Sequence, residues 1–148
     1  MFSILNILFL TFLAGQVLYL SIGLFLVQSG AKEELSQLNN IFLFAVPIID
    51  LFIIFTSKSI YTKNVTNFDK NLPLENKILS YQTNSIIQLA LLEGANIINV
   101  SVLTITANYF FAALFVIIIS LFLLNKPTKE KFIIQYELNS EDVVKILG

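Results

Sequence analysis

The chain has 148 residues, of which 56% are hydrophobic and only 13% are charged, and its mean hydropathy is +0.80. Soluble domains are about 45–50% apolar and about 25% charged, so this composition indicates an integral membrane protein. The absence of Cys and His excludes disulfides, thiol catalysis and imidazole acid–base chemistry. A net charge of −1 gives no reason to expect a nucleic-acid partner.

The first two apolar runs predict two transmembrane helices. The run at 2–28 is too long for the apolar core of a signal peptide and has no basic leader, so we interpret it as a retained helix. A polar loop at 28–40 follows, with room for a short helical turn. The second helix is predicted at about 40–58, and Pro47 inside it is expected to introduce a kink.

Two further helices and a tail complete the predicted fold. The third helix is expected at about 76–106 and the fourth at about 109–125, joined by a tight turn at Ala107–Tyr109. The predicted fold is therefore all-α, with a four-transmembrane-helix bundle at 1–125. A short cytoplasmic, amphipathic helical tail at 126–148 follows it.

The tail contains two helix-start signals. Thr128 can cap a short helix after Pro127, and Asn139 or Ser140 can begin a second one. An apolar side of this tail is predicted to lie on the membrane surface, and its residues are Phe132, Ile133, Ile134, Tyr136 and Leu138. A strand over 132–138 is the alternative.

The lysines predict the orientation of the helices. Two segments hold most of them: Lys58, Lys63, Lys70 and Lys77 after the second helix, and Lys126, Lys129, Lys131 and Lys145 in the tail. The loop after the first helix has only Lys32, beside Glu33 and Glu34. Lysine-rich segments face the cytoplasm, so four spans place both termini inside a bacterial cytoplasmic membrane. The lipid bilayer is then an expected partner.

Two acidic residues lie within the apolar segments. Glu93 is in the third predicted helix and Asp50 is in the second, and neither has a cation nearby in the sequence. A carboxylate at membrane depth costs roughly 3 kcal/mol or more. The two acids are expected at similar depth. If they are adjacent, they would share a proton or a cation, because two close negative charges repel each other.

Polar residues recur on one side of the third predicted helix. At helical spacing this side holds Ser85, Gln88, Asn96 and Asn99, with Glu93 at its edge. The first helix contributes Gln16 and Tyr19. Lipid offers such groups no partners, so we expect them to line the interior of the bundle or an interface with another subunit.

Small residues beside these positions predict close helix packing. Gly15 follows Ala14, and Gly94 precedes Ala95. Small residues allow two backbones to approach each other within a membrane. We therefore expect Gly15 and Gly94 to mark helix-packing positions.

A five-residue sequence resembles a known family. The sequence Leu91-Leu-Glu-Gly-Ala95, which follows a lysine-flanked loop, resembles the second helix of rotary ATPase proteolipid subunits. The resemblance covers about twenty residues and implies that Glu93 is an ion-binding acid. The preceding helix departs from that family, because it lacks the glycine-rich ladder and contains Pro47 and Asp50.

The second half of the chain also looks like a group of small four-helix membrane proteins of Bacteroidota to which no activity is assigned. The segments that carry this resemblance are Glu75–Lys77, Tyr81–Thr83, Ala90–Ala95, Thr106–Asn108 and Pro127–Lys131. The resemblance implies a topology and a lineage.

Two functional hypotheses follow from the sequence. The first is a small, non-enzymatic membrane protein of accessory or scaffold type, in which the buried acids hold the bundle together through hydrogen bonds. Its candidate partners are other membrane subunits or a second copy of the chain. The alternative is a proton- or sodium-translocating protein that uses Glu93. No catalytic constellation, metal cluster or cofactor motif is expected.

The predicted topology can be tested with reporter fusions. Fusions after Leu38 and after Asn108 should report the periplasm, and fusions after Asn67 and after Gly148 should report the cytoplasm. The physical basis is the lysine bias. A cytoplasmic signal at Leu38 would overturn the arrangement.

Overall fold

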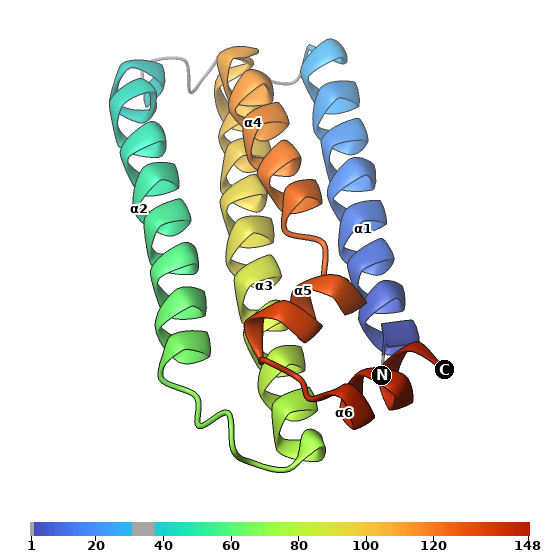
Figure 1. Cartoon of the computed structure of the whole chain (residues 1–148). Coiled ribbons are helices and arrows are strands. Elements are labelled where there is room, and N and C mark those ends of the chain that lie inside the picture. Colours follow the sequence, from blue (N-terminus) through green and yellow to red (C-terminus); the bar gives the residue numbers. More distant parts are fainter. Residues whose placement is uncertain (1, 31–37) are drawn as a thin grey trace.

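The computed structural model describes residues 2–30 and 38–148 (Figure 1). These residues form only helices: α1 (Phe2–Gln28), α2 (Asn39–Thr66), α3 (Leu74–Thr106), α4 (Phe110–Leu124), α5 (Lys129–Gln135) and α6 (Ser140–Leu147). The predicted all-α class is therefore confirmed for this part of the chain. Most of the expected polar loop, including Lys32, Glu33 and Glu34, lies outside the described residues.

Three of the helices are long and apolar enough to cross a membrane, namely α1, α2 and α3. Helix α4 has 15 residues and is only about 22 Å long, short of a hydrocarbon core of about 30 Å. It qualifies as a span only together with α5, and the two are bent by 69°. Residues 2–30 and 38–148 thus contain three candidate spans, or four if this bent pair counts as one. Helix α2 continues through Pro47 and past the predicted end at 58.

Helix α3 is the centre of the bundle. Fourteen of its residues are buried, compared with four in α1 and three in α2. It packs against α1, α2 and α4, and Figure 1 shows α1 and α2 on either side of it, with α4 in front. Its fully buried apolar residues include Ala95, Val100 and Leu103. Helices α1, α2 and α4 are therefore held together mainly by their contacts with α3.

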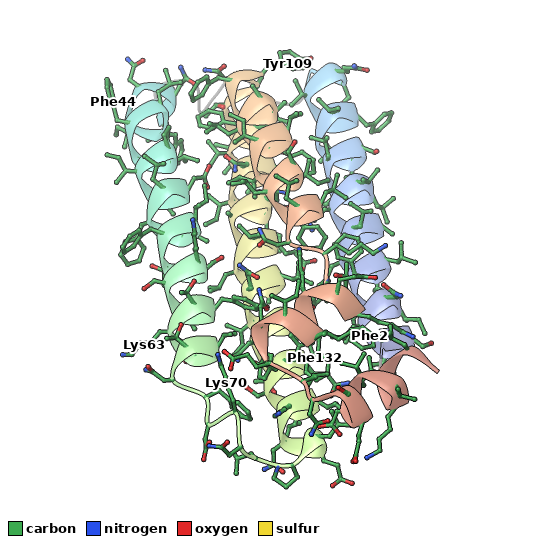
Figure 2. The ribbon with its side chains drawn as sticks, viewed as in Figure 1. Phe2, Phe44, Lys63, Lys70, Tyr109 and Phe132 are labelled. Carbon is green, nitrogen blue, oxygen red and sulfur yellow. The ribbon has the colours of Figure 1, made fainter. Side chains whose placement is uncertain are left out.

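The tail seals one end of this bundle. Figure 2 shows Phe132 of α5 at this end of the bundle, close to Phe2. Phe132 and Tyr136 are fully buried and pack with Leu5 and Tyr81. We call these four residues the end cluster. The Tyr81 hydroxyl donates to the backbone oxygen of Thr128 at 3.0 Å. The end cluster thus joins the first turns of α1, the start of α3 and the tail.

This packing corrects the expected position of the tail. Phe132 and Tyr136 were expected on the membrane surface, but they lie within the bundle end, because α4 ends early and leaves room for α5 beside α3. Ile134, by contrast, is 75% exposed. The two helix starts are confirmed: Thr128 accepts a bond from the Lys131 N–H, and Asn139 accepts one from the Asp142 N–H. The strand alternative for 132–138 is wrong.

The close helix approach lies at Gly23, a position that we did not predict. A Cβ atom built on Gly23 would lie 2.7 Å from Cγ1 of Val100 and 3.1 Å from Oγ1 of Thr104. A Cβ on Gly94 would meet no atom within 4 Å, so Gly94 is not at a tight crossing. A Cβ on Gly15 would meet only the Glu93 carboxyl, at 3.9 Å. Of Gly15, Gly23 and Gly94, only Gly23 is therefore at a tight contact between α1 and α3.

A matched pair of alanine substitutions tests this assignment. Gly23→Ala should lower the melting temperature in detergent, because overpacking costs about 1–3 kcal/mol. Gly94→Ala should leave it unchanged or raise it, because alanine is favoured over glycine in a helix by about 1 kcal/mol. Equal effects of the two substitutions would contradict a close crossing at Gly23.

Candidate functional site

The polar residues of α3 face different neighbours and do not converge on one cavity. At about 100° per residue, Gln88 and Asn99 lie within about 20° of each other, whereas Glu93 is about 120° away from Asn99. Ser85, Gln88, Asn96 and Asn99 are all buried, and Glu93 is half-buried. Because α3 has other helices around it, some of its polar side chains face α1 and others face α2.

Asp50 belongs to the interface between α2 and α3. Its side chain is 4% exposed, and its Oδ2 accepts a hydrogen bond from Nδ2 of Asn99 at 2.9 Å. Oδ1 of Asp50 and Oδ1 of Asn99 have no partner in the described part of the chain. This interaction joins α2 and α3 through two buried side chains.

Glu93 lies at the other interface, between α3 and α1. Its carboxyl faces Gly15, where the missing side chain leaves room for it. Asp50 and Glu93 are therefore at different interfaces, so the adjacency on which a shared proton or cation depends is not present. The reason is that the side chains of Asn99 and Glu93 leave α3 on different sides. When Asn99 faces α2, Glu93 faces α1.

Glu93 borders a pocket of about 320 Å³, which we call the α1–α3 pocket. The residues that line it are Gly15, Gln16, Tyr19, Glu93, Asn96, Ile97 and Phe115. Five of these are residues singled out from the sequence, from two different helices. Ile97 and Phe115 provide apolar walls, so the carboxyl is in a largely apolar setting.

Two amides inside the α1–α3 pocket have unused hydrogen-bonding capacity. Nδ2 of Asn96 donates to Oε1 of Gln16 at 2.6 Å, and both side chains are at most 3% exposed. Nε2 of Gln16 and Oδ1 of Asn96 find no partner among residues 2–30 and 38–148. Tyr19 instead shares a hydrogen bond of 3.0 Å with Ser101. The pocket is therefore lined by one carboxyl group and two amide side chains.

This arrangement suits a proton or a small monovalent cation better than a multivalent metal. One carboxylate and one amide oxygen are oxygen ligands, which hard cations prefer. In the described part of the chain, no group of three or more Asp and Glu residues is close enough to hold a metal ion. The chemistry available at the pocket is thus binding of a proton or cation.

Sequence reasoning missed a polar group near the end cluster. Asn84 is 5% exposed, accepts a hydrogen bond from Asn64 at 2.9 Å and donates to Ser80 at 3.3 Å. The Ser80 and Tyr136 hydroxyls are 2.9 Å apart. The sequence does contain a signal for Asn84. It lies four residues before Gln88, and residues at this spacing share one face of a helix.

No protein-family model, curated protein or solved structure matches the chain in the three comparisons made. The resemblances to proteolipid subunits and to four-helix proteins of Bacteroidota therefore stay predictions.

A double-mutant cycle tests whether Gln16 and Asn96 stabilise the bundle as a pair. The substitutions Gln16→Leu and Asn96→Leu should be coupled by about 0.6–2 kcal/mol, the range for interhelical hydrogen bonds in membranes. Stability would be measured by unfolding in detergent. The control cycle combines Gln16→Leu with Ser120→Ala on α4, which should be additive. A coupling of zero between Gln16 and Asn96 would contradict the pairing.

Proposed function

We propose that the chain is a small, non-enzymatic integral membrane protein of accessory or scaffold type. The main support is that buried polar side chains pair across helices, as in Gln16–Asn96 and Asp50–Asn99, and do not gather at one reaction centre. Large apolar side chains cover the outside, including Phe25, Phe44 and Phe55, each at least 70% exposed. Such a surface suits contact with lipid or with another membrane protein.

The proposed location is the bacterial cytoplasmic membrane, with both termini on the cytoplasmic side. Two observations support this. The lysines are concentrated in the segment after the second span and in the tail, and Figure 1 shows the N- and C-termini at the same end of the bundle. The bilayer is then the first partner, and other membrane subunits or a second copy of the chain are further ones.

A second candidate function is proton or sodium translocation by Glu93. The specific observation in its favour is the α1–α3 pocket, where the Glu93 carboxyl lies with the unpartnered Gln16 Nε2 and Asn96 Oδ1. Glu93 is the one acidic residue that lines this pocket among the described residues, and Asp50 is held by Asn99 at the other interface. The accessory role is therefore favoured.

The substitution Glu93→Gln separates the two functions. For an accessory protein, purified protein in liposomes should show no sodium or proton flux above that of empty liposomes. Glu93→Gln should also leave the melting temperature unchanged, because glutamine keeps the hydrogen-bonding groups without ionising. Glu75→Gln, in the exposed first turn of α3, is the matched control. Flux through the native chain that is lost in Glu93→Gln but kept in Glu75→Gln would establish the carrier instead.

A further inference from the structure

A second polar chamber lies at the end of α4, away from the α1–α3 pocket. It consists of two adjoining pockets of about 360 Å³ and about 90 Å³, which share Tyr61, Gln88, Asn125 and Gln135. Its walls come from α2, α3, the C-terminal end of α4, and α5. We call it the α2–α4 chamber. It exists because α4 ends at Leu124 while α2 and α3 continue.

The α2–α4 chamber is apolar at one end and polar at the other. Ile54, Leu92 and Leu121 line the larger pocket toward the middle of the bundle. Lys58 lies one turn beyond Ile54 on α2, and Tyr61 follows on the same side. The polar end thus lies at the lysine-rich end of the helices. An amphiphilic molecule matches this division better than a fully polar one.

The charge of the lining is entirely positive. Lys58 lines the larger pocket, Lys131 lines the smaller one, and neither Asp nor Glu is among the lining residues of either pocket. The Lys131 ammonium donates to the backbone oxygens of Leu124 at 2.8 Å and Lys126 at 3.0 Å. Lys131 is therefore fixed at the C-terminal end of α4, where a cation is favourable. An anionic group is the complement of this lining.

Gln88 adds a polar group to the lining of the chamber. Its side chain is only 7% exposed and lines both parts of the chamber. The neighbouring hydroxyl of Tyr61 is already engaged, because it donates to Oε1 of Gln135 at 2.6 Å. An amide can donate a hydrogen bond to an anionic group, so Gln88 complements the two lysines.

We propose that the α2–α4 chamber binds an anionic phospholipid. Its phosphate lies at the polar end, near Lys58 and the Gln88 amide, and its acyl chain lies along Ile54, Leu92 and Leu121. Basic pockets between membrane helices on the cytoplasmic side favour anionic headgroups, and the apolar end selects a lipid over free phosphate. This inference rests on the proposed membrane location, which fractionation of cell membranes tests separately.

The experiment measures thermal stabilisation of the purified full chain in detergent. The probes are phosphatidylglycerol, phosphatidylcholine with the same acyl chains, and inorganic phosphate. Phosphatidylglycerol should raise the melting temperature in a saturable way, and the other two should not. Lys58→Gln should weaken the apparent affinity for phosphatidylglycerol about fivefold, as expected for the loss of one lysine near a lipid surface.

Lys63→Gln is the matched control, because it removes the same charge from another exposed position of α2 but does not line the chamber. It should leave the affinity unchanged. Gln88→Leu should also weaken binding. If this variant does not fold, the comparison of Lys58→Gln with Lys63→Gln still tests the proposal. Equal loss in Lys58→Gln and Lys63→Gln would reduce the effect to surface charge and overturn the proposal. Equal stabilisation by phosphatidylcholine or by inorganic phosphate would overturn it too. A chain absent from the membrane fraction would instead refute the proposed location.

Discussion

The arrangement of the bundle depends on one constraint: polar side chains in an apolar interior need partners. Helix α3 carries most of these side chains, and they point in several directions around it. Asn96 is matched by Gln16 on α1, and Asn99 is matched by Asp50 on α2. A helix of this kind cannot lie at the edge of a bundle in lipid, because each unsatisfied group there would cost several kcal/mol. The central place of α3 and the positions of α1 and α2 follow from this.

The two polar pairs differ in what they still lack. At Asp50–Asn99 both unpartnered atoms are oxygens that accept, so this pair lacks a donor, and a proton on the Asp50 carboxyl would supply one. At Gln16–Asn96 the unpartnered atoms are one donor and one acceptor, so the amides can be completed without ionisation. The first pair is thus sensitive to protonation in a way that the second is not. A hydrogen bond between two buried polar side chains therefore depends on protonation at the α2–α3 interface but not at the α1–α3 interface.

Helix positions could be predicted from the sequence, because long apolar runs bounded by polar loops locate them directly. The contacts between helices could not be predicted in this way. They depend on the rotation of each helix about its axis, which decides whether Glu93 or Asn99 faces α2. Gly23 and Gly94 look alike in sequence, and only the opposite helix makes Gly23 tight. The apolar side of the tail fits a membrane surface or a bundle end equally well, and the shortness of α4 decides for the bundle end.

The end cluster has a consequence for the order in which the chain is assembled. Leu5 is separated from its partners Phe132 and Tyr136 by more than a hundred residues, so it leaves the ribosome well before they do. At a synthesis rate of about 5–20 residues per second, these contacts wait roughly ten seconds. During that interval α1 to α3 can insert and pair, but the end of the bundle stays open. The end of the bundle therefore closes only after the tail has been synthesised.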